Sequence, residues 1–147
     1  KLKELGADYA VDHRKDDWHK EVFKISKELA KKKGEAPGID VIFEHIGGSH
    51  FNKELTLLKY GATIVTTGAT TGYDVPADLR HIFFKGINIL GSTQGTRAEL
   101  EDGFYWMSQG KIKVIIDSVF TFENAVDAHN KMLNGKGLVG KIILKPE

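Results

Sequence analysis

Three short apolar runs, each followed by a small-residue turn, organise this sequence. They are Ile39–Ile46 before the glycine pair at 47–48, Ala62–Thr67 before Gly68, and Ile87–Leu90 before Gly91. β-branched residues are frequent in all three runs, which predicts strands. The first half of the first run is too continuously apolar for a strand with one solvent-exposed face, and this favours a parallel sheet covered on both faces.

Amphipathic helices are predicted around these strands, because apolar residues recur there at helical spacing. Thr96 with Glu99 three residues later has the spacing of a capping box, which predicts the start of one of them. The helices are expected near residues 18–33, 50–60, 79–85, 97–109 and 123–133.

Further strands are predicted at Ala7–Val11, Val114–Phe120 and Lys141–Leu144. The alternation of strands and helices from Ala7 to Gly110 is typical of right-handed βαβ units. The sequence therefore predicts an α/β fold with a doubly wound parallel sheet, followed by a tail of different character.

Composition narrows the class of protein. Lys and Arg number 21 against 20 Asp and Glu, so the formal net charge of +1 gives no support for a nucleic-acid or membrane-surface partner. No apolar run approaches the roughly 18 residues of a membrane span, and no signal-peptide pattern is present. The chain has no cysteine, which excludes disulfides and cysteine-bound zinc within it. A cytoplasmic protein is the simplest expectation.

The first residues also carry information. The chain lacks an initiator Met, and Lys1–Leu5 followed by Gly6 has the pattern of the last turn of a helix. We therefore expect the C-terminal portion of a longer protein.

Candidate chemistry lies after the three strands, because parallel sheets bind ligands at the carboxyl ends of their strands. Small residues there let a flat ligand approach the backbone, whose amides and carbonyls could bind a carboxamide or ribose. Glu44 and His45 are neighbours on a strand and point to opposite faces, so they are not expected to act on one proton. No cluster with the spacing of a metal site or a nucleophilic triad is present, and no catalytic residue is assigned.

The chain resembles the medium-chain dehydrogenase/reductase family, which includes the zinc-type alcohol dehydrogenases and their quinone and enoyl-thioester reductase relatives. The resemblance spans essentially the whole chain. It is carried by GADYAVDH at the start, DVIFEHIGG, LLKYGATIVTTGATTG, INILGSTQGTRAEL and the closing GLVGKIILKP.

The resemblance implies that residues 1–113 are the later part of a Rossmann domain that binds NAD or NADP, without its first two strands. Residues 114–147 would return to a mostly missing catalytic domain. The glycine-rich phosphate turn and any zinc ligands would lie upstream. Strand Ile87–Leu90 would pair with its twin in a homodimer. The implied cofactor-binding residues are His45, Ile46, Gly47, Thr67, Gly68, Ala69, Leu90, Gly91 and Ser92, with Lys141 near the pyrophosphate.

The expected function is hydride transfer between nicotinamide and a carbonyl or alcohol by the full-length protein, while this portion alone is expected to be inactive. Two alternatives stay open. One is an NADPH-dependent quinone or enoyl-thioester reductase without zinc. The other is a non-catalytic assembly module with a remnant cofactor site.

Overall fold

The computed structural model describes residues 1–135 and 137–146. It divides into two compact units, residues 1–93 and 94–147, and each is described here by itself. No helix among the described residues is long and apolar enough to cross a membrane. The predicted division after residue 113 concerns the domains of the full-length protein, and it stays a prediction.

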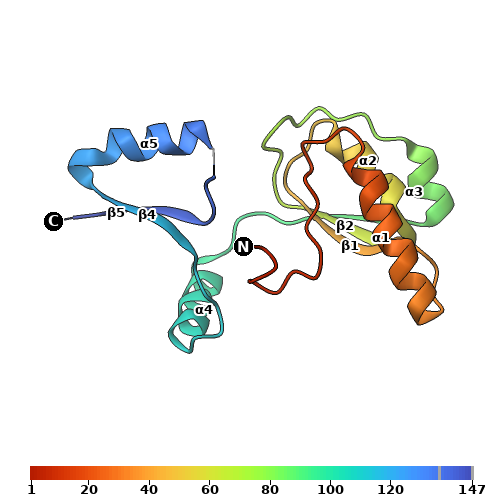
Figure 1. Cartoon of the computed structure of the whole chain (residues 1–147), viewed down its shortest axis with the longest axis horizontal. Helices are drawn as coiled ribbons and strands as arrows, with labels where there is room; N and C mark the ends of the chain where they lie inside the picture. The colour runs from red at the N-terminus through yellow and green to blue at the C-terminus, as the bar shows by residue number, and fades with distance from the viewer. Residues whose placement is uncertain (136, 147) are drawn as a thin grey trace. The chain divides into compact units, whose positions relative to one another are not determined.

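The first unit is built on a parallel sheet of three strands in the order β1-β2-β3. Figure 1 labels β1 and β2 of this sheet. Strand β1 spans Ile39–Glu44, β2 spans Leu58–Thr66 and β3 spans Asn88–Gly91. All three apolar runs that predicted strands are therefore confirmed. Their parallel pairing confirms an α/β fold.

Three helices cover one face of this sheet. Helix α1 spans Trp18–Lys33, α2 spans His50–Leu57 and α3 spans Leu79–Lys85, and α2 contacts both of the others as well as β1 and β2. The core lies between these helices and the sheet, where Leu55 and Ile64 are fully buried. The buried apolar residues that form this core are Phe51, Leu55, Leu58, Ala62, Ile64 and Ile87.

The helix ends follow from local chemistry. Gly34 ends α1 in the left-handed conformation that glycine adopts without strain, at φ 70°. The Asp78 side chain caps α3 by accepting a hydrogen bond from the N–H of Arg80. Helix α2 passes directly into β2 without a glycine, and the Lys85 ammonium donates to the carbonyls of Leu55, Thr56 and Leu58 at this end.

The opposite face of the sheet is exposed. Phe43 pairs with Val65 and Val65 with Leu90, so the three side chains share a face. Phe43 is 76% exposed and Leu90 is 53% exposed. The prediction of a sheet covered on both faces is therefore wrong for the first unit taken by itself, because all three of its helices lie on the other face.

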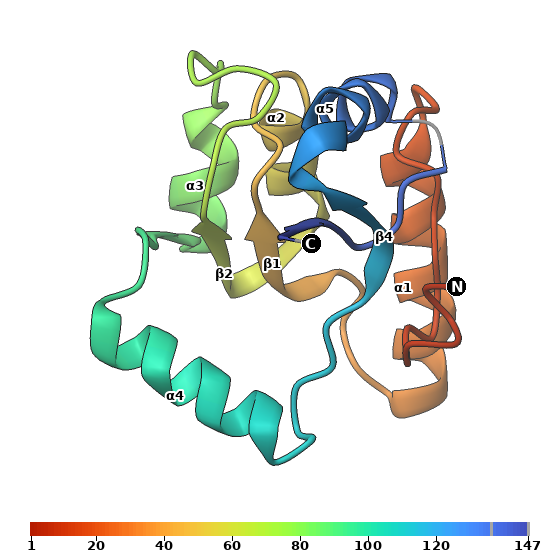
Figure 2. The same cartoon turned by 90° about the vertical axis from the view of Figure 1, so that its left-hand side faces the viewer.

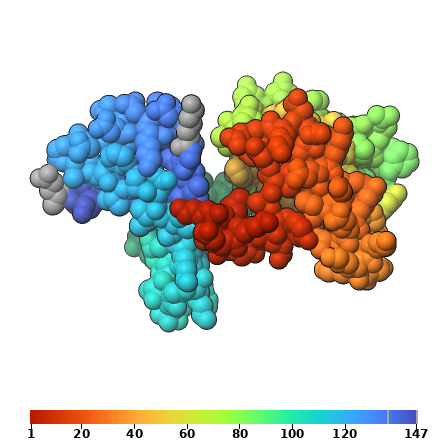
Figure 3. Space-filling model, viewed as in Figure 1, coloured from red at the N-terminus to blue at the C-terminus, as the bar shows by residue number. Residues whose placement is uncertain are grey.

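The N-terminal segment differs most from expectation. Ala7–Val11 is not a strand, and Lys1–Gly6 forms turns rather than the end of a helix. The sheet order leaves one edge of β1 without a strand. The N-terminal segment instead runs along α1, as the red and orange surfaces in Figure 3 show.

The second unit begins with helix α4, Arg97–Ser108, and the predicted capping box is confirmed by reciprocal hydrogen bonds between Thr96 and Glu99. Strand β4, Ile116–Thr121, pairs in parallel with β5, Lys141–Lys145. Between these strands the chain forms a 3₁₀ turn at Phe122–Asn124 and helix α5, Ala125–Asn134, which contacts both strands (Figure 2).

Candidate functional site

The carboxyl ends of the three strands in the first unit meet at one edge of the sheet. Glu44 is the register partner of Thr66, and Thr66 is the register partner of Gly91. The segments that follow these residues therefore lie side by side, at the edge where parallel sheets bind ligands. Ser92 extends the alignment by donating its N–H to the carbonyl of Thr66 at 3.0 Å.

Three threonines tie the loop after β2 to the end of β1. Each donates both its backbone N–H and its hydroxyl to one carbonyl oxygen: Thr67 to Glu44 at 2.8 and 3.2 Å, Thr70 to His45 at 3.1 and 2.9 Å, and Thr71 to Ile46 at 2.8 and 2.9 Å. A carbonyl oxygen has two lone pairs. These three carbonyls are therefore satisfied by the fold itself.

The Glu44 side chain organises the same turn from inside. Glu44 is 2% exposed. Its Oε1 accepts hydrogen bonds from the N–H of Ile46 at 2.6 Å and of Gly47 at 2.5 Å, and its Oε2 accepts one from the Thr66 hydroxyl at 3.3 Å. Charge-assisted bonds of this kind are stronger than neutral ones. The N–H groups of Ile46 and Gly47 are thus already bound to Glu44. The prediction that backbone amides at the strand ends are free to bind a ligand is therefore wrong at these two residues.

Gly47 is required by its surroundings as well as by its backbone. Its φ is +70°, and a Cβ at this position would collide with the carbonyl oxygen of Gly72. Gly48 donates its N–H to that same oxygen at 2.9 Å. The glycine pair thus lets the turn after β1 and the loop after β2 pack backbone against backbone.

A second buried carboxyl lies on α2. Glu54 is 7% exposed, and its Oε2 is buried without a hydrogen-bond partner among the described residues. Desolvation raises the pKa of Glu54 to about 7, and the negative charge of Glu44 makes a smaller contribution in the same direction. The strand-end turn therefore lies close to a carboxyl group that titrates near neutral pH.

The residues predicted to bind cofactor are brought together in part. Their exposed members form a rim along the strand ends and consist of His45, Thr67, Gly68, Ala69, Leu90, Gly91 and Ser92. Ile46 is half-buried and Gly47 is buried. Lys141 begins β5 in the second unit with an exposed side chain, so its predicted place near a pyrophosphate stays a prediction.

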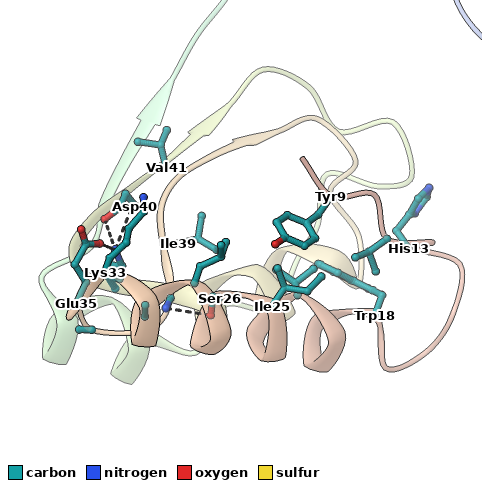
Figure 4. Close-up of a pocket in the computed structure, with 17 residues that line it drawn as sticks. Tyr9, His13, Trp18, Ile25, Ser26, Lys33, Glu35, Ile39, Asp40 and Val41 are labelled. Carbon is teal, nitrogen blue, oxygen red and sulfur yellow. Dashed lines mark hydrogen bonds and ion pairs between the residues drawn. The ribbon is translucent and has the colours of Figure 1, made fainter. Parts of the chain in front are cut away.

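A large cavity lies away from the strand ends. A groove of about 660 Å³ runs between α1 and β1, and Figure 4 shows Tyr9, Ile25 and Ile39 around this space. Its polar end holds Lys59, which pairs with Asp40 at 3.0 Å and Glu35 at 3.6 Å. None of the residues predicted to bind cofactor lines this groove.

Within residues 1–135 and 137–146, no group of three or more His, Asp or Glu residues is placed to hold a metal ion. Glu44 is buried while His45 is exposed, and the prediction that these neighbours do not share a proton stays a prediction.

Sequence reasoning missed the roles of three groups. Glu44 precedes two glycines, and this spacing places backbone N–H groups within reach of its side chain. Glu54 falls between Phe51 and Leu55 on the apolar face of α2, so helical periodicity alone predicts its burial. The third group is the threonine loop, which carries Thr67, Thr70 and Thr71. Its paired hydrogen bonds have no comparable local signal, since their acceptors lie more than twenty residues away in the chain.

Comparisons with known proteins agree with this architecture. The family model described as "Zinc-binding dehydrogenase" matches residues 5–144. Quinone oxidoreductase from Pongo abelii is 33% identical over 146 residues, which cover 95% of this chain and 41% of the relative.

Solved structures show the same fold. An NAD-dependent alcohol dehydrogenase superposes with a TM-score of 0.80 at 28% identity, over 99% of this chain and 40% of that one. The crotonyl-CoA carboxylase/reductase AntE in complex with NADP has a TM-score of 0.78 at 21% identity, over 97% of this chain and 39% of that one, which is a likeness of fold alone. The chain spans about 40% of the length of these relatives. It belongs to the zinc-binding dehydrogenases of the medium-chain dehydrogenase/reductase family.

Proposed function

We propose that the full-length protein is an NAD(P)-dependent oxidoreductase that transfers hydride between nicotinamide and a carbonyl or alcohol. This chain would supply one wall of its cofactor site. The observation that carries the proposal is the alignment of three parallel strand ends in a chain of this family. The relatives named above include an NAD-dependent alcohol dehydrogenase and a quinone oxidoreductase.

The strand-end rim fits a flat cofactor ring. Gly68, Ala69 and Gly91 are exposed and small, so a ring could approach the backbone closely. In this proposal Thr67–Ala69 and Leu90–Ser92 surround the nicotinamide, and His45–Gly47 border the cofactor. The nicotinamide itself supplies the hydride chemistry, whereas these residues bind and orient it.

The proposal extends to the sheet. The edge of β1 faces away from β2 and adjoins the groove against α1, so an extended segment could pair with β1 and cover the apolar lining. We propose that the two Rossmann strands absent from this chain occupy this position in the full-length protein. We also propose a homodimer through β3, which forms the other edge and is exposed along its length.

Cofactor binding tests the proposal. NADH and NADPH are titrated into the full-length protein, and nicotinamide fluorescence is followed. The variant Gly91→Val is the site probe, because a Cβ at Gly91 meets no atom within 4 Å and its backbone needs no positive φ. We expect saturable binding that Gly91→Val weakens at least ten-fold. The control is Gly103→Ala on α4, where a Cβ also has open space.

Each outcome favours one reading. Binding that Gly91→Val weakens and Gly103→Ala does not supports the enzyme. Failure of both nicotinamides to bind overturns it in favour of the assembly module. Where binding is found, turnover of an aldehyde, a quinone and an enoyl thioester, with the zinc content of the active protein, separates the alcohol dehydrogenase from the zinc-free reductase.

A further inference from the structure

A histidine pair outside the strand ends connects the N-terminal segment to α2. His13 lies before α1, and His50 is the first residue of α2. His13 Nδ1 and His50 Nε2 are 3.3 Å apart, and His50 Nε2 is 3.4 Å from the His13 carbonyl oxygen. The Trp18 indole stacks on the His50 ring at a centroid distance of 5.5 Å and an interplanar angle of 23°.

These distances are long for hydrogen bonds. An N–H donor usually lies about 2.7–3.2 Å from its acceptor. One N–H of His50 shared between both His13 acceptors would therefore form two weak bonds. Moreover, Nδ1 of His50 is buried without a hydrogen-bond partner in the described part of the chain, so hydrogen bonding leaves this ring poorly satisfied.

The same distances suit a shared metal ion. Zn²⁺ binds imidazole nitrogen at about 2.0–2.1 Å and oxygen at about 2.0–2.2 Å in tetrahedral geometry. Two donor atoms on one such ion are about 3.3–3.5 Å apart, as follows from those bond lengths and the tetrahedral angle. The separations of His50 Nε2 from His13 Nδ1 and from the His13 carbonyl oxygen both agree with this spacing.

We propose that His13 Nδ1, His50 Nε2 and the His13 carbonyl oxygen form a binding site for a late first-row divalent cation, with Zn²⁺ as the probe. Imidazole suits Zn²⁺, Ni²⁺ and Cu²⁺ better than it suits Mg²⁺ or Ca²⁺. Water completes the coordination, since only two side chains contribute. Arg14 adds little repulsion, because its guanidinium is paired with the Asp12 carboxylate at 2.8 and 2.9 Å.

The bound ion would fasten the N-terminal segment to the start of α2. That helix begins two residues after the glycine pair of the strand-end turn. A ligand that binds the folded state alone stabilises it by RT ln(1 + L/Kd), where L is the free ligand concentration. Metal binding would therefore raise thermal stability. This inference is independent of nicotinamide binding, and its test needs no cofactor.

The test uses the 147-residue chain after treatment with EDTA and buffer exchange. Zn²⁺ is titrated by calorimetry, and the imidazole nitrogen resonances of ¹⁵N-labelled protein are recorded. We expect one ion per chain, with shifts at His13 and His50. Loss of even an outer-shell partner weakens metal binding about 10–100-fold, so His13→Ala and His50→Ala should each weaken it at least that much. The controls are His81→Ala and His129→Ala.

The outcomes are distinct. Saturable binding that both test variants lose and both controls retain supports the site, as does a Zn²⁺-dependent rise in Tm absent from His13→Ala. His13 is exposed, so this variant decides the question if His50→Ala fails to fold. No saturable binding, or binding of equal strength in His13→Ala, overturns the proposal.

Discussion

The Glu44 carboxylate lies 2.5 Å from the backbone nitrogen of Gly47, three residues further along the chain. The same carboxylate oxygen accepts the N–H of Ile46, so one buried charge fixes both amides of the turn after β1. These hydrogen bonds from backbone N–H groups satisfy the buried oxygen and offset part of the cost of its burial. The shape of the strand-end turn therefore depends on a charge that faces the interior.

Replacing Glu44 tests this dependence. Glu44→Ala leaves the buried N–H of Gly47 and the partly buried N–H of Ile46 without an acceptor, and an unsatisfied buried group costs about 1–3 kcal/mol. We expect the free energy of unfolding to fall by about 3 kcal/mol in urea denaturation. The matched control is Glu35→Ala, whose exposed carboxylate makes a single 3.6 Å contact with Lys59. That control should change stability by less than about 1 kcal/mol, and an equal loss in both variants would contradict the prediction.

Glu54 should make stability depend on pH near neutrality. Its pKa of about 7 in the folded chain compares with 4.5 for an unperturbed carboxyl. Between these values the folded state keeps a proton that the unfolded state releases, so the free energy of unfolding falls as pH rises through this window and levels off above it. The total change is at most about 3 kcal/mol.

Urea denaturation between pH 4.5 and 8 measures this effect. Glu54→Gln cannot ionise, so the difference between its curve and that of the parent chain should grow with pH and favour the variant at pH 8. Glu21→Gln on the exposed face of α1 serves as the control and should follow the parent curve. Parallel curves for the parent chain and Glu54→Gln would show that Glu54 does not titrate in this range.

Gly47→Ala separates backbone strain from steric contact. Gly47 and Gly61 have φ values of +70° and +71°, yet a Cβ collides with the Gly72 carbonyl at the first position and meets nothing within 4 Å at the second. Both substitutions carry the left-handed penalty of roughly 1–2 kcal/mol. Gly47→Ala should lose about 1–3 kcal/mol more, the usual range for overpacking. Denaturant midpoints of the two variants measure the difference, and equal midpoints would contradict the close approach.

Phe43 should contribute to association rather than to stability. It is 76% exposed on the open face of the sheet, beside Val41 at 49%. Phe43→Lys should therefore change the free energy of unfolding by less than about 0.5 kcal/mol, while light scattering at high concentration falls. Tyr73→Lys, at a loop residue that is 90% exposed, is the control and should alter scattering less. A large loss of stability in Phe43→Lys would mean that this face is covered in solution.

The strands and caps of this fold could be predicted because their causes are local. Thr96 and Glu99 lie three residues apart, and both hydrogen bonds of the capping box form. The predicted strand Ile87–Leu90 corresponds to β3, which ends one residue later, at Gly91. Ala7–Val11 has the composition of a strand, yet a strand also needs a neighbour with which to pair. Local composition does not supply that neighbour, so the prediction failed there.

The candidate site was predictable in position but not in detail. The topology of parallel strands predicted that the segments from His45 to Ser92 lie at one edge of the sheet, whereas their role in cofactor binding stays a prediction. It gave no means of knowing which backbone groups the fold itself occupies. The two hydrogen bonds from Thr67 to the carbonyl of Glu44, and the burial of Glu44, depend on contacts across the sheet.

The threonine loop limits how the length of this region can change. Thr70 and Thr71 are adjacent and bind the adjacent carbonyls of His45 and Ile46, each through two donors. One residue inserted between them would move one donor pair out of step and release an acceptor that two bonds now satisfy. Single substitutions here remove one hydroxyl, whereas an insertion or deletion disrupts a whole pair. The chain at Thr70 and Thr71 should therefore tolerate changes of side chain far better than changes of length.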